Sequence, residues 1–396
     1  MSATRIPECV ASSRINDRFS KFRSWMQHGR GNVPSRSPEM TQLPPIRLAV
    51  IGAGFSRQAH VPALKKLSAH LEVVAVFSRK TQNAEALAGH FGRGVRALTS
   101  IEALLDLPGV EAVDVALPIG LAEDTVERAL NRGFHVFSEK PIAATVARGV
   151  QLLQVYEARK PPVIWCVAEN LRFTRHLEKV RGLIEDGEIG EMILCHAPTF
   201  VPIRGTPWFK TDWRRAPAYA GGFLLDGGVH DIAALRFVLG NVAEVSAYTR
   251  AVEPNIPPMD SLVCAMRFES GVIASHSVSY ALEMPALTLA AKGVGFLSGA
   301  LWRIRDRFGG RWHFLGTRGS IFVAAGTVEL VRGIRRFVFK IASNAIHDEF
   351  LEFAEAVREG KPLRNSPKEG LNDIAVVEAM LESSNTRAAV CPRVFR

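Results

Sequence analysis

Short apolar runs alternate with amphipathic segments through the first part of the chain, beginning at Ile46. The runs have the length and the bounding glycines of buried parallel strands, and the segments between them have the apolar spacing of helices. This alternation predicts right-handed βαβ units in a doubly wound parallel sheet, the Rossmann architecture. The expected strands lie within 46–54, 71–78, 110–118 and 134–141, the expected helices within 58–68, 81–92, 121–133 and 144–160, and a short strand and a helix within 95–109.

The pattern changes after Pro161 and Pro162, which we take as the domain boundary. Later runs show alternation of apolar and polar residues broken by glycines, which predicts an open, mainly antiparallel sheet. The expected strands lie within 191–200, 242–252, 261–282 and 313–333, and the chain ends in two expected helices within 346–360 and 368–388. We therefore predict a Rossmann domain at 46–162 and an α+β domain for substrate binding and oligomerisation at 163–396.

The composition is that of an ordinary soluble protein, with 47% hydrophobic and 22% charged residues in 396. No apolar run approaches the roughly 20 residues that span a membrane, so we expect no membrane partner. The five cysteines are scattered, with no pair at metal-ligand spacing. We expect reduced thiols in a cytoplasmic protein, and no metal site.

The net charge of +10 raises the question of nucleic-acid binding, but its distribution argues against that function. Residues 1–45 hold seven basic and three acidic residues, so they carry +4 of the total. The rest shows no basic helix with interleaved aromatic residues and no nucleic-acid module. A basic surface that attracts an anionic cofactor or substrate accounts for the charge as well.

Residues 1–45 are rich in Arg and Ser and have no sustained periodicity. Such a composition is typical of a flexible extension or of an organellar transit peptide. Both interpretations remain open, and with them import into an organelle as the alternative to the cytoplasm.

The segment "GAGFSR" joins the first expected strand to the first expected helix. Gly52 and Gly54 allow a tight turn and close approach of a pyrophosphate to the helix N-terminus. Glycine pairs after a strand are common in any α/β fold, but this position between strand and helix favours dinucleotide binding. Arg57 stands where the usual third glycine or alanine would be and could meet a phosphate directly. The predicted cofactor-binding residues here are Gly52, Gly54, Phe55, Ser56 and Arg57.

The end of the second expected strand, "VFSRKTQN", indicates which dinucleotide binds. Proteins selective for NAD usually have an acidic residue here that holds the ribose hydroxyls. This chain has Ser78, Arg79 and Lys80, whose donors suit a 2′-phosphate. The other interpretation is a solvated basic turn. We predict NADP, with NAD as the less favoured cofactor.

Two further segments carry candidate chemistry. "FSEKPIA" follows the strand within 134–141, and "GGFLLDGGVHDIAALRFVLG" spans residues 221–240. A partly desolvated lysine such as Lys140 can exchange a proton with a substrate oxygen. In the second segment Asp226 and His230 are four residues apart, so in a continuous helix they would share one face. An imidazole can take the proton of a substrate hydroxyl.

In these two segments, and in much of the sequence from Ile46 onward, the chain resembles the glucose-fructose oxidoreductase / inositol dehydrogenase family (Gfo/Idh/MocA). The resemblance implies that Lys140 lies beside the nicotinamide and the substrate oxygen, and that Asp226 and His230 belong to the second catalytic segment. Asp226 would orient the substrate or His230. It also implies homo-oligomers, for which we expect a homodimer or homotetramer through the C-terminal sheet. The remaining residues expected near the cofactor or substrate are Pro118, Glu139 and Asn170.

Two departures from the family pattern keep a second hypothesis open. Ile119 and Ala122 stand where the family often has asparagine and histidine, and Ala233 replaces a carboxylate that often follows the catalytic histidine. We predict an oxidoreductase that transfers hydride between NADP and a small sugar-, polyol- or cyclic diol-like substrate. The alternative is a non-catalytic, dinucleotide-sensing regulator of the same fold. Residues 293–311 fit no expected element.

Overall fold

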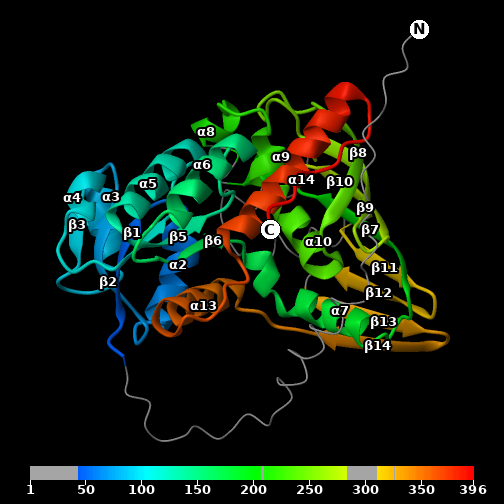
Figure 1. Cartoon of the computed structure of the whole chain (residues 1–396), viewed down its shortest axis with the longest axis horizontal. Helices are drawn as coiled ribbons and strands as arrows, with labels where there is room; N and C mark the ends of the chain where they lie inside the picture. Colours follow the sequence, from blue (N-terminus) through cyan, green and yellow to red (C-terminus); the bar gives the residue numbers. More distant parts are fainter. Residues whose placement is uncertain (1–42, 207–208, 210, 283–309, 325) are drawn as a thin grey trace, which may run out of the picture. The chain divides into compact units, whose positions relative to one another are not determined.

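The computed structural model describes residues 43–396 except 207–208, 210, 283–309 and 325 (Figure 1). The predictions for residues 1–42 and for most of 293–311 therefore lie outside the described residues. Residues Pro45–Arg396 form a unit of their own, in which two sheets carry the architecture (Figure 1).

The first sheet contains six strands, and every pairing in it is parallel. Its order is β3-β2-β1-β4-β5-β6, which confirms the predicted doubly wound sheet. β6 lies after the predicted boundary at Pro161 and Pro162, and the division into domains stays a prediction. The strands are β1 (Ile46–Ile51), β2 (Leu71–Phe77), β3 (Arg96–Leu98), β4 (Ala112–Val115), β5 (His135–Glu139) and β6 (Trp165–Ala168).

Helices cover both faces of this sheet because strands such as β1, β4 and β6 bury residues on each side. One face packs against α2, α3 and α13 through residues such as Leu64, Leu87 and Phe353. The other face packs against α4, α5 and α6 through residues such as Leu105, Leu130 and Leu152. These helices are α2 (Phe55–Lys66), α3 (Thr81–Ala88), α4 (Ile101–Leu105), α5 (Ile119–Arg132), α6 (Val146–Glu157) and α13 (Ala345–Glu359).

The second sheet has eight strands in the order β14-β13-β12-β11-β7-β10-β9-β8. Only β7 and β10 pair in parallel, so the predicted open, mainly antiparallel sheet is confirmed. Its strands are β7 (Met192–Phe200), β8 (Val242–Arg250), β9 (Ser261–Phe268), β10 (Ile273–Ser279), β11 (Trp312–Gly316), β12 (Gly319–Ala324), β13 (Thr327–Arg332) and β14 (Arg335–Lys340).

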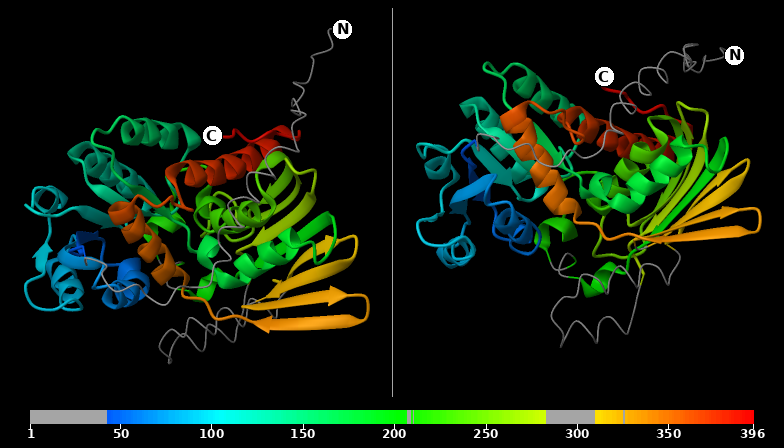
Figure 2. Two further views of the ribbon diagram at one scale, coloured as in Figure 1. Left: turned by 60° about the horizontal axis from the view of Figure 1, so that its bottom comes forward. Right: turned by 90° about the horizontal axis from the view of Figure 1, so that it is seen from below.

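Helices lie along one side of this second sheet (Figure 2). β9 shows the consequence, because its residues alternate between buried and exposed along the strand. The helices of this half of the chain are α7 (Arg175–Glu185), α8 (Asp212–Arg215), α9 (Gly222–Asp226), α10 (Val229–Leu239) and α14 (Pro367–Thr386), with a 3₁₀ turn η2 (Asn170–Phe173) after β6.

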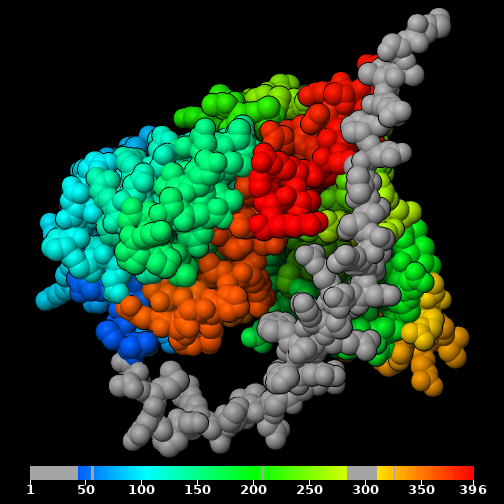
Figure 3. Space-filling view, viewed as in Figure 1, coloured from blue at the N-terminus to red at the C-terminus, as the bar shows by residue number. Residues whose placement is uncertain are grey.

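The last two helices tie the C-terminal part of the chain to the first sheet. α13 packs against α2, and α14 packs against α6, β6, α10 and β8. Figure 3 shows both at the surface, α13 in orange and α14 in red. The expectation of reduced thiols holds for Cys166, Cys195 and Cys264, which are free and buried.

Candidate active site

The glycine turn lies between β1 and α2, at the C-terminal edge of the first sheet. Gly52 has φ +120°, and a Cβ there would lie 2.2 Å from the carbonyl oxygen of Ala116, so only glycine fits. Gly54 is the N-cap of α2, and no side chain caps the free amides. β1 has β2 on one side and β4 on the other, which is the switch point where doubly wound sheets bind nucleotides.

This turn fits a dinucleotide, because free amides at a helix N-terminus favour a pyrophosphate. Phe55, Ser56 and Arg57 begin α2, and their side chains lie outside what the structure describes. Pro118 is the N-cap of α5 and follows β4, so it lies at the same edge of the sheet.

The predicted basic turn follows β2 at this edge. Ser78 is buried and its amide donates to the carbonyl of Leu98, whereas Arg79 and Lys80 are exposed. Lys80 is the N-cap of α3. Within the described part of the chain neither cation forms a salt bridge.

Lys140 directly follows β5, and the peptide bond between it and Pro141 is cis. Its Nζ donates to the backbone oxygen of Asp226 at 2.6 Å and to Oδ1 of the same residue at 3.0 Å. Lys140 and Asp226, which were predicted separately as site residues and lie 86 residues apart, are thus in direct contact. The side chain of Lys140 keeps 13% of its surface exposed.

Asp226 is held by two cations. Arg214 Nε donates to its Oδ2 at 2.6 Å, and the guanidinium of Arg214 lies 3.9 Å from the centre of the Trp213 ring. Burial alone would raise the pKa of Asp226, but Lys140 and Arg214 lower it from 3.8 to about 2. Asp226 is therefore an ionised anchor for Lys140. Arg214 was not among the site residues predicted from the sequence.

Asp226 and His230 do not share the face of one continuous helix, contrary to the expectation from their spacing. A turn at Gly227 and Gly228 separates α9, which ends at Asp226, from α10, which carries His230. A Cβ on Gly227 would lie 2.7 Å from the Tyr280 hydroxyl, and one on Gly228 would lie 2.4 Å from the Leu224 carbonyl oxygen. Asp226 contacts Lys140 and Arg214 instead of orienting His230.

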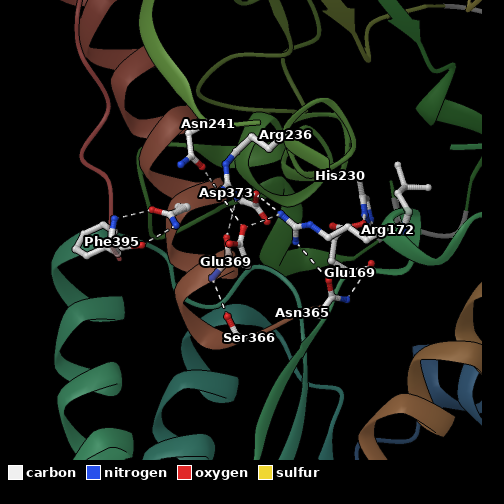
Figure 4. Close-up of polar contacts among 12 residues, drawn as sticks. Glu169, Arg172, His230, Arg236, Asn241, Asn365, Ser366, Glu369, Asp373 and Phe395 are labelled. Atoms are coloured by element: carbon white, nitrogen blue, oxygen red, sulfur yellow. Dashed lines mark hydrogen bonds and ion pairs between the residues drawn. The ribbon is translucent and has the colours of Figure 1, made fainter. Parts of the chain in front are cut away.

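His230 has a different carboxylate partner. Its Nδ1 lies 2.8 Å from Oε1 of Glu169, which follows β6 and is the N-cap of η2 (Figure 4). Sequence reasoning missed Glu169 and singled out its neighbour Asn170, which is half-buried at the start of η2. The one feature of the sequence that pointed to Glu169 was its place as a polar residue directly after a buried strand.

A second cluster of charged side chains lies inside the first sheet's helical layer. His60 on α2 contacts Asp114 of β4 through Nδ1 and Glu139 of β5 through Nε2, both at 2.9 Å. Burial alone would lower the pKa of His60, but Asp114 and Glu139 raise it well above its ordinary value. Glu139, expected near the ribose or the substrate, is thus bound to His60 and keeps 17% of its side chain exposed. Glu349 of α13 faces the same cluster.

The described residues contain neither a candidate metal centre nor a candidate membrane span. No group of three or more histidine, cysteine, aspartate or glutamate residues among them could hold a metal ion. None of the helices that they form is long and apolar enough to cross a membrane.

Comparison with known proteins places the whole described chain among oxidoreductases. A family model described as an oxidoreductase family with an NAD-binding Rossmann fold matches residues 46–165, and the model of its C-terminal alpha/beta domain matches residues 181–391. The dehydrogenase FPY6 of Fusarium mangiferae is 29% identical, and the match covers 86% of this chain and 96% of that protein.

Several other matches exceed 30% identity, including an enzyme and a solved structure. The dTDP-3,4-didehydro-2,6-dideoxy-alpha-D-glucose 3-reductase of Saccharopolyspora spinosa is 32% identical over 70% of this chain and 74% of that enzyme. A crystal structure of an oxidoreductase from Thermotoga maritima is also 32% identical, covers 88% of this chain and 98% of that one, and gives a TM-score of 0.77.

Proposed function

This chain belongs to the Gfo/Idh/MocA family of NAD(P)-dependent oxidoreductases, and we propose that it uses NADP to interconvert an alcohol and a carbonyl group on a sugar-like substrate. The contact of Lys140 with Asp226 carries the proposal. It fixes an ammonium group beside the edge of the sheet where the glycine turn receives a dinucleotide.

Lys140 is well placed to polarise a substrate oxygen. An ammonium group has three N–H donors, and two of them are engaged by the backbone and side-chain oxygens of Asp226. The third can donate to the hydroxyl or carbonyl oxygen of the substrate. The ionised carboxylate of Asp226 orients the ammonium group of Lys140, whose positive charge can stabilise negative charge developing on that oxygen.

His230 is the proposed proton carrier. When bound, the nicotinamide would accept or supply the hydride at the substrate carbon, and a proton must leave the hydroxyl as the carbonyl forms. The ring of His230 is bonded at Nδ1 and 30% exposed, so its other nitrogen remains for the substrate. A positioned base of this kind contributes roughly 10²–10⁴ in rate.

Three residues support NADP as the cofactor. Arg79 and Lys80 are exposed cations at the end of β2, and Ser78 adds a hydroxyl. Charge-assisted bonds from such groups suit a 2′-phosphate, whereas an acidic residue there would repel it.

The relatives support a sugar-like substrate. The reductase from Saccharopolyspora is named for a carbonyl group on a nucleotide-linked sugar, and the same chemistry suits a polyol or a cyclic diol. The alternative of a non-catalytic dinucleotide sensor is less favoured, because such a sensor needs no lysine bound to an ionised aspartate.

The test is a screen of sugar ketones, polyols and cyclic diols with both cofactors. The absorbance of the reduced nicotinamide measures turnover. We expect turnover with NADPH or NADP⁺, and tighter binding of NADPH than of NADH. Lys140→Met should lower turnover by roughly 10²-fold or more and leave NADPH affinity unchanged. Undiminished turnover in this variant would refute the role of Lys140, and equal affinities for the two cofactors would refute the choice of NADP.

We also propose a homodimer or homotetramer formed through the second sheet. Tyr248, Val263 and Ile273 are more than half exposed on the neighbouring strands β8, β9 and β10. Apolar residues clustered on one open face favour burial against another copy. Light scattering at micromolar concentration should give a multiple of 43.4 kDa, and a monomer would contradict this assembly.

A further inference from the structure

Glu169 is buried just after β6, and several hydrogen bonds fix both its backbone and its side chain. It is 2% exposed, and its Oε1 accepts from the Leu171 amide at 3.1 Å as well as contacting Nδ1 of His230. Its own backbone oxygen accepts from Nδ2 of Asn365 at 3.0 Å. Backbone and carboxylate are thus both fixed.

A buried ionic network that includes Asp373 of α14 lies next to Glu169 and His230 (Figure 4). Arg172 contacts Asn365 at 3.4 Å and Asp373 at 2.6 Å, and Arg236 of α10 also donates to Asp373. The network therefore joins η2, which begins beside Glu169, to α10, which carries His230. It limits how far Glu169 and His230 can move relative to each other.

The carboxylate of Glu169 is negatively charged. Burial by itself raises its pKa, but the charges of His230 and Arg172 and the hydrogen bonds from His230 and Leu171 bring it below the ordinary value. An ionised carboxylate only accepts hydrogen bonds. The hydrogen in the contact with His230 must therefore lie on Nδ1.

We propose that Glu169 is a positioning residue that holds His230 in the Nδ1–H tautomer, so that Nε2 is the nitrogen that takes the proton from the substrate. The catalytic assignment of His230 rests on the proposed function, whereas the tautomer does not. The arrangement follows the logic of an Asp–His pair, in which the carboxylate orients the imidazole and stabilises the imidazolium.

The second carboxylate oxygen of Glu169 indicates that this residue positions His230 and does not only stabilise the fold. Oε2 is buried and has no hydrogen-bond partner among the described residues. An unsatisfied buried polar group destabilises the folded state, and a neutral side chain of the same shape could accept from Leu171 without burying a charge. The negative charge beside His230 is therefore what distinguishes glutamate at this position.

Nuclear magnetic resonance of the full chain labelled with [¹⁵N]histidine tests the tautomer directly. Two-bond ¹H–¹⁵N correlations distinguish Nδ1–H from Nε2–H, and the signal of His230 among the 11 histidines is assigned by its loss in His230→Asn. We expect the Nδ1–H form in the unmodified protein near neutral pH. The Nε2–H form would overturn the proposal without any variant having to fold.

Kinetics test the consequence. In Glu169→Gln we expect kcat to fall at least roughly tenfold, as part of the 10²–10⁴ that a positioned base provides, with the acid limb of the pH profile moved and NADPH affinity unchanged. The matched control is Glu185→Gln on α7, which removes a carboxylate bonded to Arg181 Nε at 2.8 Å and lies outside this network. Normal kcat and pH profile in Glu169→Gln, or an equal loss in the control, would refute the role. If no substrate turns over, the proposed function fails while the tautomer result stands.

Discussion

Two clusters of buried carboxylates in this molecule differ in the cations beside them. Asp226 and Glu169 in the site are 3% and 2% exposed, and Asp114 and Glu349 in the interior cluster are 0% and 1% exposed. Their pKa values nevertheless shift in opposite directions: downward for the first pair and upward for the second. Burial is the same, so burial does not decide the charge.

The charged groups beside these four carboxylates make the difference. Asp226 has both Lys140 and Arg214 within hydrogen-bond distance. Among the described residues, Asp114 contacts His60, which also contacts Glu139. One imidazole shared by two carboxylates does not offset the desolvation of the whole group. In the candidate site the carboxylates of Asp226 and Glu169 are therefore ionised. The interior cluster instead links α2, β4 and β5 through one histidine.

The largest expected effect comes from removing that histidine. His60→Ala leaves Asp114 and Glu139 without their shared partner inside the protein. Loss of one partner from a buried ionic group costs roughly 3–5 kcal/mol, partly relieved here because Asp114 can take up a proton. We expect the free energy of unfolding in urea at pH 7 to fall by about 3 kcal/mol.

His230→Ala is the control, because it removes a histidine from the candidate site instead of from the interior cluster. This ring is 30% exposed, and Glu169 keeps its bond from Leu171, so we expect a loss of less than about 1.5 kcal/mol. Turnover should show the opposite order, with the larger loss in His230→Ala. Equal destabilisation by the two substitutions would mean that the two histidines do not differ as the structure indicates.

The sequence predicted the fold from local patterns. The parallel first sheet and the mainly antiparallel second sheet follow from periodicity, glycine turns and segment length, and both are confirmed. β6 and β14 lie outside the expected strands. The positions of Gly52 and Lys140 were predictable for the same reason, since each lies where a strand ends.

The partners of the candidate residues could not be predicted from local patterns. Glu169 meets His230 across 61 residues, and His60 meets Glu139 across 79. Helical spacing led to the expectation that Asp226 and His230 share one helix face, because it assumes a continuous helix through Gly227 and Gly228, where the structure has a turn between α9 and α10. Tyr280 packs against Gly227, and such a tertiary contact cannot be predicted from helical periodicity in the sequence.

The smallest expected effect concerns Glu349, which belongs to the interior cluster. Its Oε2 is buried without a partner among the described residues. Burial, and then the neighbouring Glu139, raise its pKa well above the ordinary value of 4.5 although His60 acts in the opposite direction. The folded protein therefore keeps this carboxyl protonated at a pH where the unfolded chain has released the proton. A raised pKa of this kind makes folding less favourable as the pH rises above about 4.5.

Glu349→Gln removes that pH dependence, because the amide does not titrate. The variant and the unmodified protein should have the same free energy of unfolding near pH 4 within about 0.5 kcal/mol, and the variant should become progressively the more stable of the two toward pH 8. Urea unfolding at several pH values measures this difference. Glu359→Gln at the exposed end of α13 should follow the unmodified protein throughout. Parallel curves for Glu349→Gln and the unmodified protein would mean that the folded state ionises Glu349 as readily as the unfolded chain does, and the contrast between the two clusters would then reduce to Asp114 alone.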